Sequence, residues 1–432
     1  MRGIGVGGAM VLAALVSAGI AGAQEAEVRP FTWGASLDVR EEYHDNVRLA
    51  EEKTETSDTL TGITVGAHAE AKRLRLDAGA RYEGEAVYYG KSENPDKYYH
   101  RWNGTATYAL VRERFWAEAG AARSQVPRDT REPALFDNLV DTDTWWVGAR
   151  YAQPLGSSMS FSAKYRYGGQ QFEDVPSANN RFQDANAALT VSVSRWASLS
   201  AFYGWDETDV RDGVDITRRQ TGMTLGVQVV PKTTISATYG YNWIETSEGF
   251  EREGPFFSLG LGVGESWEIT KNTFLSFGYG RGYSDSAAEM RYPGPGGAIV
   301  YDTIAVEPVQ TDSANVTLTR RGEESTLSVS GIWSRTKYLE TGRTVAGPGG
   351  RASLQWEITP RTSFNAGLDY RITKYEEEDR TDRIATGSAT LSYKLRRWLT
   401  AALYANRSQR DSSVAGEDYI GNVYGARLTA VY

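Results

Sequence analysis

The sequence lacks cysteine altogether and has very little histidine. Of 432 residues none is cysteine, and three are histidine: His44, His68 and His100. Disulfide frameworks, thiolate metal sites and cysteine nucleophiles are therefore excluded. Basic residues are also in deficit, because 47 Lys and Arg stand against 55 Asp and Glu and give a formal net charge of −8. The chain thus lacks the excess of basic residues that is typical of a nucleic-acid-binding protein.

Long hydrophobic runs are missing after residue 20. The mean hydropathy is −0.47, and no later segment approaches the roughly 18 consecutive apolar residues that a membrane-spanning helix needs. Glycine and the aromatic residues are abundant instead, with 45 Gly, 25 Tyr, 12 Trp and 13 Phe. A polar chain with this aromatic content is typical of a membrane β-barrel, in which only alternate residues meet lipid.

The first residues predict an export signal. Arg2 supplies a positive charge, residues 4–20 are almost continuously small or apolar, and residues 21–23 read Ala-Gly-Ala, an A-x-A cleavage site. The alternative is a membrane anchor, but the run is marginal in length for a span. We expect a signal peptide over residues 1–23 and a single barrel domain over residues 24–432.

From Phe31 onward, apolar and polar residues alternate in runs of about ten. Nine short turns separated by ten longer polar loops indicate 20 strands, or 18 or 22 if one hairpin is miscounted. We therefore predict an all-β fold: a transmembrane, antiparallel, up-and-down β-barrel of about 20 strands in the bacterial outer membrane. A soluble sandwich or propeller is disfavoured, because small residues fill mid-strand positions, aromatics gather near strand ends and no blade repeat recurs.

The last strand carries the most specific signal. Tyr424, Leu428 and Tyr432 fall on one face of an alternating run that continues to the final aromatic residue. Outer-membrane barrels typically end in this way. The similarity implies that these residues are read by the barrel-assembly machinery.

The polar faces of the strands predict the lining of the lumen. Twenty strands close into a cylinder of roughly 20 Å radius, which side chains alone do not fill. The candidate lumen-lining residues are Asp38, Arg40, His68, Arg75, Asp77, Arg81, Glu83, Arg101, Arg150, Lys164, Arg166, Asp369, Arg371, Lys394 and Arg427. Two interpretations stay open: a mildly cationic channel for a polar or anionic polymer, or a wet wall braced by Arg–carboxylate pairs.

Two tryptophans and one loop are further candidates. Trp116 and Trp146 break the parity of their lipid-facing neighbours, so they either stack on sugar rings or anchor irregular strand ends. The loop over residues 284–311 is the longest, and it either constricts the lumen or stays outside it. Acidic loops around residues 206–215 and 376–379 either bind divalent ions or are simply solvated.

No residue set converges on a catalytic, cofactor or metal site, so we expect no enzyme activity.

The segment Tyr43-His44-Asp45-Asn46-Val47 resembles the Tyr-x-Asp-Asn-hydrophobic segment of β-barrel porins from exopolysaccharide export loci. The resemblance implies an outer-membrane exit for a secreted polysaccharide, which works with a periplasmic polysaccharide export protein and an inner-membrane synthesis complex. It assigns no catalytic residue, and His44 occupies the variable position.

Two functions therefore remain. The first is a polysaccharide conduit; the second is a general diffusion porin or a structural, adhesive barrel. In either case we expect a monomer surrounded by outer-membrane lipid and lipopolysaccharide.

Overall fold

The computed structural model describes residues 30–51, 54–91, 96–129, 138–230, 233–262, 267–270, 272–286 and 306–432, and the expected signal peptide over residues 1–23 lies outside them. Almost every element in the described part is a β-strand. The first eleven strands are β1 (Phe31–His44), β2 (Asp58–Lys72), β3 (Leu76–Tyr89), β4 (Lys97–Val111), β5 (Phe115–Pro127), β6 (Leu139–Pro154), β7 (Met159–Phe172), β8 (Asn180–Ser194), β9 (Ala197–Val210), β10 (Ile216–Val230) and β11 (Thr233–Thr246).

A further ten strands follow. They are β12 (Glu251–Gly262), β13 (Trp267–Thr270), β14 (Thr273–Asp285), β15 (Pro308–Arg321), β16 (Ser325–Tyr338), β17 (Thr344–Thr359), β18 (Thr362–Tyr375), β19 (Arg380–Arg396), β20 (Leu399–Ser412) and β21 (Tyr419–Val431). A short 3-10 turn, η1 (Pro176–Ala178), lies between β7 and β8. In the described part of the chain, no helix has the length and apolarity that a membrane crossing requires.

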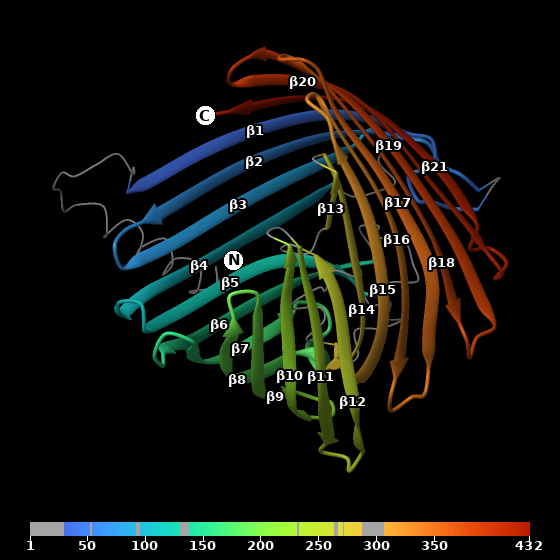
Figure 1. Ribbon diagram of the computed structural model, residues 1–432. Coiled ribbons are helices and arrows are strands. Elements are labelled where there is room, and N and C mark those ends of the chain that lie inside the picture. The colour runs from blue at the N-terminus through green and yellow to red at the C-terminus, as the bar shows by residue number, and fades with distance from the viewer. Residues whose placement is uncertain are drawn as a thin grey trace, which may run out of the picture.

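The strands close into a barrel. Each pairs antiparallel with its neighbours, and β1 pairs with β21 from Ser36 opposite Val431 to His44 opposite Val423, so the first strand lies beside the last (Figure 1). Strands β12 and β13 both pair with β14 and occupy one position in the wall. The described strands therefore form a closed antiparallel barrel of 20 positions, which confirms the predicted fold.

The two faces of the wall differ as the alternation predicts. On β19, Leu391 and Tyr393 point outward and are each 44% exposed, whereas Thr390 and Ser392 share the inner face with Asn365 and Ser363 of β18. Closure gives every strand two neighbours, so the peptide groups are hydrogen-bonded within the wall and only apolar side chains need face hydrocarbon. Outward aromatics such as Trp356 and Trp398 lie near the short turns, where an interfacial girdle is expected.

The predicted loop lengths are wrong at several hairpins. Apart from β13, the strands run for 12 to 17 residues, longer than the nine to eleven or so that a membrane crossing needs. The acidic loop predicted around residues 206–215 is reduced to the connection between Val210 and Ile216, because β9 continues through Asp206 and Asp209. The acidic loop around residues 376–379 is the whole connection between Tyr375 and Arg380. The hydrogen-bonded ladder continues above the membrane, where both faces are polar and the alternation that marks a strand disappears.

A charge on the outer face at mid-height should destabilise the barrel. Leu391 lies five residues before the end of β19 at Arg396, which places it about 12 Å above that end, near the centre of a band about 25 Å tall. We expect Leu391→Arg to lower the free energy of unfolding by about 2–4 kcal/mol. The measurement is urea unfolding of the barrel in lipid vesicles.

The matched control is Thr390→Arg, which places the same charge one residue away on the inner face. It should change the free energy of unfolding little, because the charge meets water. Equal losses for the two variants would contradict the assignment of the faces.

Candidate functional site

Ion pairs line the inner wall of strands β5 to β10. Most of the paired side chains come from adjacent strands, because cross-strand neighbours on one face stand about 5 Å apart, whereas Lys164 of β7 reaches Glu118 of β5 across β6. The pairs, with their N–O distances, are Arg150–Glu118 (2.9 Å), Lys164–Glu118 (3.6 Å), Arg166–Asp184 (3.0 Å) and Arg218–Asp206 (2.7 Å). Each cation has an anion beside it, so this part of the lumen is polar but close to neutral.

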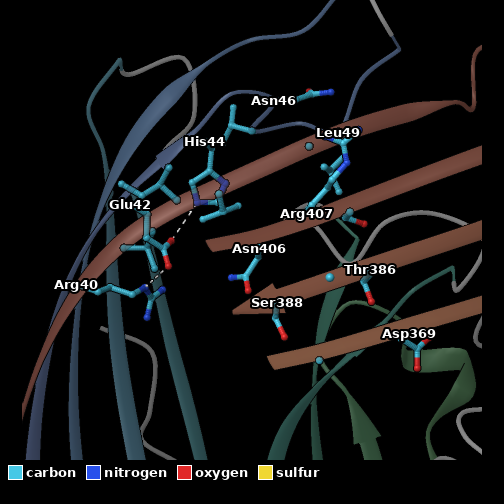
Figure 2. Close-up of a pocket in the computed structure, with 18 of the residues that line it drawn as sticks. Arg40, Glu42, His44, Asn46, Leu49, Asp369, Thr386, Ser388, Asn406 and Arg407 are labelled. Atoms are coloured by element: carbon cyan, nitrogen blue, oxygen red, sulfur yellow. Dashed lines mark hydrogen bonds and ion pairs between the residues drawn. The ribbon is translucent and has the colours of Figure 1, made fainter. Parts of the chain in front are cut away.

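A second charged cluster lies on the inner face of β1 to β4. Arg40 pairs with Glu85 of β3 and, at 3.3 Å, with Glu42. Glu42 also accepts hydrogen bonds from His44 Nε2 at 3.0 Å and from the Tyr404 hydroxyl of β20, and Figure 2 shows the row formed by Arg40, Glu42 and His44. Glu42 is thus held by three donors from two sides of the β1–β21 seam.

This row borders a cavity of about 680 Å³ inside the barrel. Its opposite wall comes from β17 to β20 and carries hydroxyl and amide groups, among them Ser353, Thr386, Ser388, Asn406 and Ser408. Figure 2 shows Ser388, Thr386 and Asn406 across the pocket from the charged row. Short hydroxyls and amides both donate and accept hydrogen bonds, as the hydroxyls of a sugar do.

Trp116 and Trp146 face the lumen. Trp116 pairs with Arg150 across β5 and β6, and the guanidinium carbon of Arg150 lies 4.2 Å from the centre of its ring. Trp146 lies across β5 where Gly120 has no side chain, because a Cβ there would lie 2.6 Å from the indole. The glycine lets this ring lie against the wall, with Arg166 5.7 Å from the ring centre. Both rings are inner-wall residues rather than lipid anchors.

The external end of the lumen is bridged from wall to wall. A buried apolar cluster joins Val140, Phe172 and Ala178 to Val309 and Tyr338. The first group comes from β6, β7 and η1 and the second from β15 and β16, which are far apart around the wall. These side chains can meet only across the barrel interior, so apolar contacts narrow its external mouth.

The strand ends beside the 284–311 loop form a second bridge. The Thr208 hydroxyl of β9 donates to Asp285 of β14 at 3.4 Å, and both residues are buried. Ile216 and Ile244 pack with Tyr283 in one buried cluster. The described ends of the predicted constriction loop therefore lie inside the barrel mouth, whereas residues 287–305, which include its Pro-Gly segment, lie outside the described residues.

Carboxylates gather at the same place. Glu307 precedes β15, is 5% exposed and pairs with Arg343 at 3.0 Å. Burial raises the pKa of Glu307, although the hydrogen bond and charge of Arg343 oppose the shift. Burial and the nearby carboxylates of Glu307 and Glu248 likewise raise the pKa of Glu340. Glu307 and Glu340 therefore favour the protonated form more than a solvated carboxylate does.

The Tyr43–Val47 segment closes the barrel seam. Asp45 accepts hydrogen bonds from the backbone N–H and the side-chain amide of Asn422 on β21, at 2.7 and 2.6 Å. Asn46 donates to the backbone carbonyl of Ile420 at 3.0 Å, and Val47 packs into a buried cluster with Leu60 and Val87. The acid and amide of this segment therefore join the first strand to the last. Burial opposes but does not outweigh the Asn422 hydrogen bonds, which lower the pKa of Asp45.

Strand pairing places nearly all predicted lumen-lining residues on the inner face. Asp38, Arg40, His68, Asp77, Arg81, Glu83, Arg101, Arg150, Lys164, Arg166, Asp369, Arg371, Lys394 and Arg427 lie there. Several meet directly: Arg101 pairs with Glu83 at 2.9 Å, and Arg427 with Asp38 at 3.5 Å. Arg75 is the exception, because it lies in the turn before β3, which begins at Leu76.

Sequence reasoning missed several partners that neutralise this wall. Asp206 and Arg218 have the inner-face parity, but they sit where polar residues occupy both faces and alternation gives no signal. Glu85 follows the alternation two residues after Glu83, so the same pattern could have found it. The bridging residue Val309 fell within the loop predicted over residues 284–311, so no contact across the lumen was expected from it. The predicted assembly residues Tyr424, Leu428 and Tyr432 lie on the outer face, 55%, 44% and 84% exposed.

These features define a porin-like β-barrel of the bacterial outer membrane: a closed antiparallel wall, an apolar outer face and a polar interior. Residues 350–432 match the family model described as "Putative beta-barrel porin 2", which confirms the resemblance to β-barrel porins. None of the curated protein sequences matches the chain.

Solved barrels share the fold at low identity. A variant of the ferric enterobactin receptor from Pseudomonas aeruginosa, in complex with enterobactin, is 11% identical, with 93% of this chain and 81% of the receptor covered and a TM-score of 0.51. The FrpB iron transporter from Neisseria meningitidis is 9% identical, with 93% and 82% covered and a TM-score of 0.50. At such low sequence identity, the similarity to these barrels shows a shared fold alone.

The bridge across the lumen can be captured chemically, because the native chain has no cysteine. In a Thr208→Cys, Asp285→Cys double variant, a short bismaleimide should join the two thiols, since the native side chains are hydrogen-bonded. Mass spectrometry of the digested protein detects the product. The control is Tyr203→Cys with Tyr279→Cys, on the outer faces of the same strands, which should give no cross-link. Labelling of both thiols without a bridge in the first variant would contradict a closed mouth.

Acidification should favour the closed mouth. The raised pKa of Glu307 means that the buried, closed arrangement binds a proton more tightly than an open, solvated one does. The closed arrangement is therefore stabilised at low pH, and this stabilisation is lost as the pH rises through the raised pKa. We expect single-channel open probability in planar bilayers to be low in acid and to rise as the pH increases through the raised pKa of Glu307.

The Glu307→Gln, Glu340→Gln double variant should flatten this pH dependence. Glu323→Gln, in the short turn between β15 and β16 at the opposite end, should leave it unchanged. An unaltered pH profile in the double variant would refute the assignment to these carboxylates.

Proposed function

We propose that the protein is an outer-membrane conduit through which a secreted polysaccharide leaves the cell by passive translocation. The observation that carries the proposal is the inner wall, where hydroxyl and amide groups on β17 to β20 face ion-paired charges on β1 to β4 across a cavity, and further ion pairs line β5 to β10. Such a surface offers many weak hydrogen bonds to a hydrated glycan but no tight binding site that would stop its translocation.

Of the two interpretations of the inner charges, the ion pairs favour the one in which the charges brace the wall over the one in which they attract an anionic polymer. Arg150 and Lys164 share Glu118, and Arg166 and Asp184 are paired, so little positive charge is left for a ligand. We propose that the passing chain is held mainly by hydroxyl and amide groups and by the faces of Trp116 and Trp146. Synthesis upstream would supply the push, through a periplasmic polysaccharide export protein, and the barrel itself would catalyse no reaction.

The bridged external mouth disfavours the alternative of a general diffusion porin. Val140 and Phe172 pack with Val309 across the lumen, and a permanently open pore would have water in their place. A mouth closed by apolar contacts and a few hydrogen bonds fits a conduit that opens when its polymer arrives. Purified protein should therefore give rare or brief openings in planar bilayers rather than large, steady currents.

Deletion of the gene should abolish or strongly reduce secreted polysaccharide while its synthesis continues. The measurement compares polymer in the medium with polymer retained in the periplasm, with plasmid-borne protein as the control for restoration. Undiminished secretion from the deletion strain would remove the proposal.

The inward tryptophans provide a finer test. We expect the Trp116→Ala, Trp146→Ala double variant to weaken oligosaccharide block of channel current about five-fold per ring, which corresponds to about 1 kcal/mol of lost stacking each. Trp145→Ala is the matched control, because Trp145 lies next to Trp146 on the outer face and is 37% exposed. Block that weakens equally in both variants would mean that stacking in the lumen is not its cause.

A further inference from the structure

A shallow groove of about 490 Å³ runs across the outer face of strands β16 to β20. Its floor is made of small outward residues in two rows, Gly350 and Ala352 on β17 and Ala385 and Gly387 on β19, and β18 lies between the rows. With no larger side chain at these positions, the wall is thin here and the neighbouring side chains stand above it.

Apolar side chains flank this floor. Val329 of β16 and Leu368 and Tyr370 of β18 border the groove and are 49%, 66% and 47% exposed. In register, Val329 lies opposite Ala352 and Leu368 opposite Gly387. An extended hydrocarbon chain would lie over Ala385 and Gly387 of β19, between Leu368 and Tyr370 on one side and Arg407 and Gln409 of β20 on the other.

Arg407 of β20 lies at one end of the groove and faces outward. Its Nη1 donates to Asn422 Oδ1 at 3.3 Å, and no carboxylate of the described residues pairs with it. Several other outward arginines do have a carboxylate partner: Arg219 with Glu245, Arg281 with Asp312, Arg335 with Glu376 and Arg383 with Asp411. Arg407 therefore keeps donors for an anion from outside the chain.

The side chain of Arg407 can reach the outer-leaflet headgroups. Arg407 follows Leu399, the first residue of β20, by eight positions, which places its Cα about 20 Å above the periplasmic end of a band about 25 Å tall. The Cα is thus about 5 Å below the outer edge of the band, and the long side chain extends from there to the lipid phosphates, whereas the apolar part of the groove lies deeper along the tilted strands.

We propose that the groove binds lipid A of lipopolysaccharide, with one acyl chain along the row of Ala385 and Gly387 and a phosphate on Arg407. Charge complementarity selects the headgroup, because guanidinium and phosphate form charge-assisted, bidentate hydrogen bonds. The site is on the outside of the wall, so the inference goes beyond the proposed conduit and does not depend on what passes through the lumen.

Native mass spectrometry of the barrel, extracted in mild detergent and then incubated with purified lipid A, tests the proposal. Wild-type protein should retain one lipid A, and Arg407→Gln should lower the retained fraction at least five-fold. The matched control is Arg219→Gln, which removes an outward, carboxylate-paired arginine on β10 and should retain lipid A as the wild type does. Heat-modifiable migration on gels verifies that each variant is folded.

A second variant tests the groove itself. Gly387→Leu keeps Arg407 but fills the floor, where the added Cβ would already lie 3.4 Å from Leu368, and it should also lose lipid A. Equal retention by Arg407→Gln and wild type would overturn the proposal, as would displacement of wild-type lipid A by excess inorganic phosphate alone. A dimer mass in place of the lipid adduct would assign the groove to a second copy of the chain and overturn it as well.

Discussion

Every peptide group within a bilayer must find its hydrogen-bond partner inside the protein, and a sheet with a free edge cannot provide one. The seam between β1 and β21 is therefore the contact on which the rest of the structure depends. It is reinforced above the paired residues, where Asp45 binds Asn422 and Asn46 binds the carbonyl of Ile420. A segment that resembles a family signature thus has a mechanical role: it fixes the first strand to the last at the external rim.

Closure divides the side chains into two environments with opposite demands. The outer face excludes charge from its middle, whereas the inner face accepts Arg and carboxylate together because each neutralises the other in contact with water. Pairing consumes most of the positive charge that a simple tally of inner residues would offer to a ligand, as Glu118 shows by serving both Arg150 and Lys164. What the lumen then presents to a solute is a surface of hydroxyls, amides and a few aromatic faces.

The external mouth follows a different rule from the wall below it. Side chains such as Val140 and Val309, both 0% exposed, are buried against the opposite side of the barrel rather than against lipid. The buried carboxylate of Glu307 lies beside this apolar bridge and the more exposed Glu340 lies near it, so the mouth combines packing with groups that respond to protons. A wide barrel is thereby closed without a separate plug domain among the described residues.

Alternation alone determined the closed all-β fold, the 20 positions of the wall and the inner face of residues such as Arg40, Lys164 and Lys394, because a period of two assigns every side chain to one face. It misplaced Arg75 and the ends of hairpins, since strands that continue into water lose the apolar half of the pattern. The tertiary structure alone decided which walls meet across the lumen. Thr208 and Asp285 are 77 residues apart, and their contact depends on the closed cross-section of the whole barrel, which no local pattern encodes.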